Sequence, residues 1–169
     1  MTEGTIYSIN TSPGGVPKLP VPDAMVTVMG LDTDSHRNLK YHGGPERAVC
    51  IFAIERILAL QEQGHPIGTG TTGENLTLVG IDWDLVVPGA MLETGESLME
   101  VVSYTTPCRT IRESFTDEKF SRLSQKHFPG WSRVYARVIR EGMVRTGDRA
   151  VLTPAELPRS KGWIESLFP

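Results

Sequence analysis

A chain of 169 residues, 39% of them hydrophobic, is long enough to bury one core, so a single domain over residues 1–169 is expected. The net charge of -3 argues against a nucleic-acid partner, because such proteins normally present a basic face to phosphates. No apolar run approaches the ~20 residues that span a bilayer, and the N-terminus has no signal-peptide pattern. We therefore expect a soluble, cytoplasmic protein with no membrane partner.

Short apolar runs separated by 17 glycines and 12 prolines are typical of a mainly β domain. Several runs alternate apolar and polar residues, as in MVTVM and RVYARVI, which places one face of a strand inward. The expected strands cover residues 5–9, 25–29, 48–52, 75–79, 90–93, 98–104, 133–140 and 149–152.

Three segments are expected to be helical. Residues 54–63 have apolar side chains at helical spacing and stop before Gly64. The segment that begins at Thr116 opens with Thr-Asp-Glu, a pattern of helix starts, and runs to Pro129. A short C-terminal helix is expected over residues 160–168, within a tail of residues 153–169 that follows a core of about residues 6–152.

The two cysteines have different settings. Cys50 lies in AVCIFAI, so it is expected on a core strand as a small hydrophobe with a raised pKa. Cys108 lies in TTPCRTI, directly after an expected strand, where loops present functional groups. Arg109 and Arg112 would favour its thiolate, the form that attacks sulfur and binds soft metals. An inert cysteine beside two solvated arginines is the alternative.

Three polar loops are candidates for ligand binding. In YHGGPERAV, Gly43 and Gly44 allow close backbone approach, and His42 beside Arg47 could meet an anion, although a tight loop would look the same.

In TTGENLTL, Glu74 could move a proton and Asn75 could anchor a polar ring, although a β-turn is also consistent with this pattern. In GGVPKLPV, flanking prolines restrain Lys18 before it meets a phosphate, although a solvated loop lysine is the commoner case.

The spacing of the histidines and cysteines does not match a zinc site, and nucleotide-binding and serine-hydrolase motifs are missing from the sequence. A first-row metal site and these two protein classes are therefore disfavoured.

Taken together and in this order, the motifs resemble the MOSC domain, the family named for the C-terminal domain of molybdenum cofactor sulfurase. The resemblance rests on GGVPKLPV, GLDTDSHR, YHGGPERAV, TGENLTL, TTPCRTI and the closing GWSRVYARVIREGMVRTGDRAVL. Two positions depart from the family pattern, because Thr33 stands where a glycine is usual and Thr106 where arginine or glutamine is common. Arg109 or Arg112 could take over from the missing basic residue.

The resemblance implies a compact β-barrel-like fold with a few short helices. It also implies binding of the molybdenum cofactor (molybdopterin), with Cys108 as the metal ligand, and the family is associated with pyridoxal phosphate as well. Glu74 and Asn75 would line the substrate side. The residues expected to hold the cofactor are Lys18, Asp34, His36, Arg37, His42, Gly43, Gly44, Arg47 and Arg109.

Three functions remain open at this point. Stand-alone bacterial members of the family resemble reductases of N-hydroxylated compounds, so the first is an oxidoreductase that takes electrons from separate donor proteins and acts on a small-molecule substrate. The second is a sulfur carrier that accepts a persulfide on Cys108 from a pyridoxal-phosphate-dependent cysteine desulfurase. The third is a binding module in which the cysteine is incidental.

Overall fold

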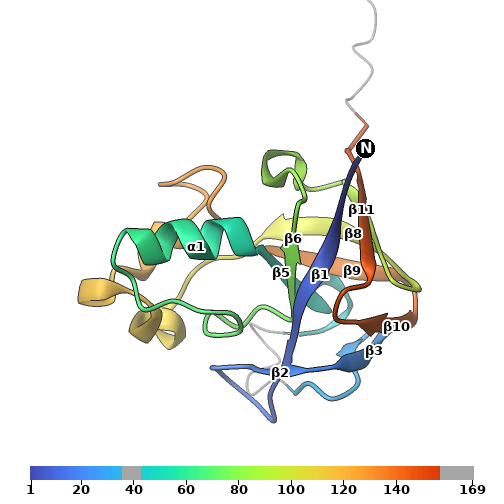
Figure 1. The fold of residues 1–169 in the computed structure, drawn as a ribbon, viewed down its shortest axis with the longest axis horizontal. Helices are drawn as coiled ribbons and strands as arrows, with labels where there is room; N and C mark the ends of the chain where they lie inside the picture. Colours follow the sequence, from blue (N-terminus) through green and yellow to red (C-terminus); the bar gives the residue numbers. More distant parts are fainter. Residues whose placement is uncertain (36–42, 157–169) are drawn as a thin grey trace, which may run out of the picture.

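The long strand β1 (Thr2–Thr11) closes a seven-stranded barrel, because its first residues pair with β11 and its middle pairs with β6. The structure is a computed structural model that describes residues 1–35 and 43–156. Around the barrel the order is β1, β11, β7, β8, β9, β5 and β6 (Figure 1). The other barrel strands are β5 (Val49–Ala53), β6 (Leu76–Val79), β7 (Met91–Thr94), β8 (Ser97–Tyr104), β9 (Val134–Arg140) and β11 (Arg149–Thr153).

One pair of barrel strands is parallel, and it needs a crossover. Strands β5 and β6 run in the same direction, and α1 (Ile54–Glu62) makes the connection between them. Ile57 and Leu60 of α1 are fully buried, so the helix seals its side of the barrel. The remaining strands are β2 (Leu19–Val21), β3 (Asp23–Thr27), β4 (Gly30–Leu31) and β10 (Gly142–Arg145). Figure 1 shows α1 on one side of the barrel strands, with β2, β3 and β10 along the lower end of the barrel.

The pairing of β5 with β9 separates an inner from an outer face. Val49 lies opposite Ala136, and both are buried in the barrel core. Cys50 lies opposite Tyr135 in the next pair, so these two side chains point to the other face of the sheet. The outer face of β5 and β9 therefore carries Cys50 and Tyr135. The candidate site lies on this face.

The mainly β, barrel-like fold expected from the sequence is confirmed, and each of the eight expected strands overlaps an observed strand. The short strands β2, β4 and β10 were not expected, because two to four residues give too little alternation to recognise. The expected helix over residues 54–63 is confirmed as α1. The expected C-terminal helix lies outside the described residues.

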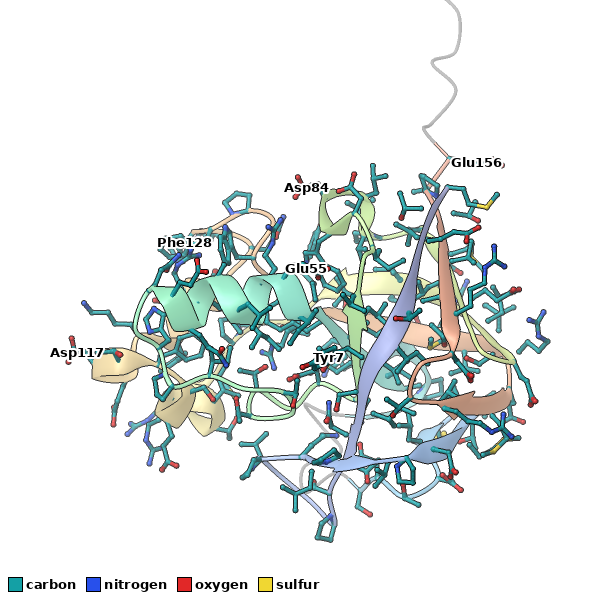
Figure 2. All side chains as sticks on the ribbon, in the orientation of Figure 1. Tyr7, Glu55, Asp84, Asp117, Phe128 and Glu156 are labelled. Carbon is teal, nitrogen blue, oxygen red and sulfur yellow. The ribbon has the colours of Figure 1, made fainter. Side chains whose placement is uncertain are left out.

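The expected helix from Thr116 to Pro129 is wrong. This segment forms 3-10 turns at Thr116–Glu118 and Phe120–Leu123. The Thr116 hydroxyl donates to the Gly64 carbonyl, and its amide donates to His65 Nδ1, so neither group caps a helix. Asp117 also has a left-handed φ of 56°, which interrupts any helix. Figure 2 shows Asp117 at the end of the molecule opposite β3 and β10.

Within the described ranges, no helix is long and apolar enough to cross a membrane.

Candidate functional site

A cavity of about 550 Å³ opens on the outer face of β5 and β9. Loops from four distant parts of the sequence surround it, because the barrel brings the end of β1, the start of β5, the start of β6 and the end of β8 to one place. The described residues that line it are Gly15, Val16, Lys18, Ser35, Gly43, Arg47, Cys50, Thr72, Gly73, Asn75, Thr106, Cys108, Thr110, Ile111, Arg112, Arg133 and Tyr135.

Cys108 lies at this cavity, between the end of β8 and a 3-10 helix that covers Arg109–Ser114. The amide of Thr105 donates to the Arg133 carbonyl at 3.0 Å, which ties the connection to β9. The Cys108 carbonyl accepts from the Ile111 amide, and Sγ lies 2.9 Å from Thr110 Oγ1. The side chain is half-buried. The expected strand end before Cys108 is therefore confirmed, and a 3-10 helix follows it.

The two arginines after Cys108 differ in their position relative to the cavity. Arg112 lines the cavity, and its Nε lies 3.6 Å from Glu118 Oε1. Arg109 is exposed and is not among the lining residues. The structure therefore places Arg112, but not Arg109, where it could replace the basic residue missing at Thr106.

The buried strand position and the raised pKa expected for Cys50 are confirmed, but the residue also lines the cavity. The residue is buried on β5, as expected, but its side chain lies opposite Tyr135 on the outer face. Burial raises the pKa of the Cys50 thiol to about 11. The Cys50 thiol is therefore protonated at neutral pH, and it forms part of the cavity wall.

Lys18, Asp34 and Asn75 form one buried network. Lys18 makes an ion pair with Asp34 Oδ2, and only 7% and 2% of the two side chains are exposed. The same oxygen accepts from Asn75 Nδ2 at 2.8 Å, while Asp34 Oδ1 accepts from the Ser12 amide. The alternative of a solvated loop lysine is excluded. The positive charge of Lys18 is already balanced before any ligand binds.

Glu74 lies behind the cavity wall and not at its surface. Its Oε1 accepts from the Gly70 amide at 2.6 Å, and its Oε2 accepts from the Thr72 hydroxyl at 2.8 Å. Burial raises the pKa of the Glu74 carboxyl, and these hydrogen bonds partly oppose the shift. Glu74 was expected on the substrate side together with Asn75. The structure brings only Asn75 to the cavity, and Glu74 holds the 70–75 loop from within.

The glycine-rich loop before β5 reaches the cavity through Gly43 and Arg47. Gly44 precedes the 3-10 turn Pro45–Arg47, with a positive φ of 82° that favours glycine. The Arg47 guanidinium lies 5.9 Å from the centre of the Tyr135 ring. Three further expected residues, His36, Arg37 and His42, lie outside the described part of the chain.

Sequence reasoning missed Arg133 and Tyr135 as site residues. Arg133 is buried at the start of β9, where its Nη1 donates to the Thr72 carbonyl. Burial raises the pKa of Tyr135 to about 12, so its hydroxyl stays protonated. Their alternation with Val134 and Ala136 in RVYARVI was the available signal, but it could not show which strand lies alongside.

The cavity is basic although the whole chain is acidic. Among the described residues that line it, none is acidic and four are basic: Lys18, Arg47, Arg112 and Arg133. No group of three or more metal-ligating His, Cys, Asp or Glu side chains occurs in residues 1–35 and 43–156. This lining suits an anion better than a free metal ion.

The MOSC domain family model matches residues 38–151, which is more than half of the chain. The chain belongs to the MOSC domain family. MOSC domains are associated with molybdenum-cofactor binding, and in this MOSC chain both Cys108 and the basic cavity residues except Lys18 lie within the matched segment.

Two curated MOSC relatives are bacterial proteins. The uncharacterized protein YflK of Bacillus subtilis is 29% identical over 136 residues, which are 79% of this chain and 60% of YflK. YiiM of Escherichia coli is 30% identical over 118 residues, which are 67% of this chain and 53% of YiiM. The MOSC chain thus spans little more than half the length of these relatives.

Solved structures of other proteins share the fold. The crystal structure of YiiM from Geobacillus stearothermophilus superposes with a TM-score of 0.69 at 26% identity, over 89% of this chain and 75% of that one. The crystal structure of the YUAD protein from Bacillus subtilis has a TM-score of 0.74 at 16% identity, over 92% and 100% of the two chains. The second likeness bears on the fold alone.

Proposed function

We propose that this MOSC chain binds a molybdenum cofactor in the cavity and that the Cys108 thiolate is the protein ligand to the metal. One observation carries the proposal: Cys108 lines a cavity of about 550 Å³ whose charged described lining residues are all basic. A thiolate is a soft ligand of the kind that suits such a metal centre, and basic side chains suit an anionic cofactor.

The residues of the cavity fit such a group. The buried Nε of Arg133 has no hydrogen-bond partner among the described residues, so the site offers a donor that a ligand oxygen would satisfy. Arg47 and Arg112 add positive charge, and Asn75 and Thr72 add polar atoms at the wall. Since the described residues contain no further cluster of metal ligands, Cys108 would supply the protein's bond to the metal.

The proposed reaction is the reduction of an N-hydroxylated small molecule. When bound, the cofactor would supply a metal centre able to transfer electron pairs to the substrate. The N–O bond breaks with uptake of two electrons and two protons, and the oxygen leaves as water. Separate donor proteins would deliver the electrons. The chain's own part is to hold the cofactor through Cys108 and the basic residues and to shape the space beside them.

Metal analysis tests the binding proposal. Protein purified from cells that make the cofactor should contain molybdenum, and Cys108→Ser should lose most of it because a serine hydroxyl is a poor soft ligand. Cys50→Ser is the matched control, since it removes the other thiol of the cavity and should retain the metal. Equal molybdenum in wild type and Cys108→Ser, or none in wild type, contradicts the proposal.

A second function is favoured by the half-buried position of Cys108 at the cavity. A partly exposed thiol is accessible to another protein, so Cys108 could accept a persulfide from a cysteine desulfurase. Incubation with a desulfurase and cysteine should then add the mass of one sulfur atom to the Cys108 peptide. If a known acceptor protein is loaded under the same conditions and this chain is not, the carrier function is excluded.

A further inference from the structure

Arg133 differs from the other basic residues of the cavity because it is buried and yet makes no ion pair among the described residues. The residue is only 6% exposed, and its Nη1 donates to a neutral group, the Thr72 carbonyl. Its Nε is buried and has no hydrogen-bond partner in the described part of the chain. The side chain lines the cavity beside Thr72 and Gly73.

The buried Glu74 carboxyl attracts the Arg133 charge electrostatically, but no hydrogen bond or ion pair joins these two side chains among the described residues. Lys18 and Asp34 are paired with each other, and the Glu74 carboxylate accepts from Gly70, Thr72 and Thr77. The Nε–H group of Arg133 is left buried without a hydrogen bond, which is unfavourable unless a ligand atom accepts from it.

The free edge of the guanidinium defines the ligand that suits it. With Nη1 held by Thr72, the Nε and Nη2 side of the fork remains, and this side presents two parallel N–H donors. Two oxygens of a phosphate or similar oxyanion match that spacing, whereas one carbonyl oxygen does not.

We infer that Arg133 is the anion-binding residue of the cavity and that it takes the phosphate group of a phosphate-bearing small molecule. Lys18, restrained between prolines and expected from the sequence to meet this phosphate, instead acts through Asp34 to position Asn75. The inference deepens the proposed function, since molybdopterin carries a phosphate. It does not depend on the metal or on Cys108.

Phosphate binding to cofactor-free protein tests the inference. Protein made in cells that cannot synthesise the cofactor is titrated with inorganic phosphate by calorimetry at constant ionic strength. Arg133→Gln can still donate to the Thr72 carbonyl but loses the charge and the fork, so its phosphate affinity should fall about tenfold or more. The matched control is Arg137→Gln on the same strand, whose guanidinium is exposed and paired with Glu100, and it should bind phosphate as wild type does.

Equal affinity in wild type and Arg133→Gln, or equal loss in both variants, overturns the inference. If Arg133→Gln does not fold, nuclear magnetic resonance of wild-type protein with labelled arginine gives the answer. Phosphate should then shift the Arg133 Nε–H signal and leave that of Arg137 in place, and an unmoved Arg133 signal overturns the inference.

The two proposals fail separately. If Arg133→Gln loses phosphate binding while wild type made with the cofactor contains no molybdenum, the anion site stands and the proposed function falls. If Cys108→Ser alone loses molybdenum while Arg133→Gln binds phosphate normally, the proposed function stands and the anion site falls.

Discussion

Single residues around the cavity differ in their chemistry although they lie close together. Cys50 and Cys108 both line it, but Cys50 is buried on a strand and Cys108 is half-buried in a turn. A thiol reacts through its thiolate, and burial raises the pKa of Cys50 to about 11. The two thiols should therefore be chemically distinguishable.

Alkylation at pH 8 should modify Cys108 and spare Cys50. A thiol with a pKa of about 11 has only about a thousandth of its population as thiolate at pH 8, and the fraction rises as the pH approaches 11. Mass spectrometry of the two cysteine peptides after iodoacetamide treatment measures this. In Cys108→Ser the protein should remain unlabelled at pH 8. Equal labelling of the two peptides in wild type would contradict the assignment.

Sequence reasoning found part of the site at this scale. It selected Lys18, Gly43, Arg47, Asn75 and Cys108, and the structure brings these five residues to one cavity. Their loops carry local signals, such as a proline pair, a glycine pair and a Pro-Cys. Arg133 carries no such signal, because its importance comes from burial beside Thr72, which is distant in the sequence.

At the scale of elements, the 70–75 loop connects two sets of buried polar contacts. One is the network of Lys18, Asp34 and Asn75, and the other is the set of hydrogen bonds that Glu74 accepts. The Gly70 carbonyl accepts from the Lys18 amide, and the Gly70 amide donates to Glu74. Gly70 has a φ of 75°, and a Cβ there would collide with the Lys18 carbonyl oxygen. Only glycine fits this position, because both the backbone conformation and the space exclude a side chain.

Gly70→Ala should therefore destabilise the protein strongly, by about 3 kcal/mol or more, through a collision added to backbone strain. Gly64→Ala is the matched control, because Gly64 has a φ of 91° and open space around it. It should cost only about 1 kcal/mol, from the left-handed backbone alone. Urea denaturation of both variants gives the comparison. Equal losses would show that the contact with Lys18 can relax freely.

The elements themselves were predictable where their pattern was local. Alternation identified the barrel strands, and apolar spacing with a terminal glycine identified α1. The expected helix at Thr116 failed because the capping groups of Thr116 bond to Gly64 and His65, more than fifty residues earlier. A sequence pattern contains no record of such a long-range contact.

At the scale of the whole molecule, a buried carboxyl makes folding depend on pH. Glu74 is fully buried, and burial raises its pKa above the ordinary value of 4.5. Between 4.5 and the raised pKa, the folded state binds more protons than the unfolded state. The free energy of unfolding therefore falls as pH rises through this window, by about 1.4 kcal/mol for each unit of pKa shift.

Glu74→Gln should remove this dependence, because an amide does not titrate. The difference in free energy of unfolding between variant and wild type should move in favour of the variant as pH rises from 5 to 7. Taking the difference cancels His65, whose lowered pKa acts in the opposite direction. Urea midpoints at several pH values measure it. Parallel profiles for the two proteins would mean that the Glu74 carboxyl is ionised in the fold.

For the whole molecule, the central proposal is that Cys108 ligates the metal of a molybdenum cofactor. X-ray absorption at the molybdenum edge tests this most directly, with wild type and with the small fraction of Cys108→Ser that still retains molybdenum. The spectrum of Cys108→Ser should show one sulfur neighbour fewer than wild type, while Cys50→Ser should match wild type. An unchanged sulfur count in Cys108→Ser would contradict the claim.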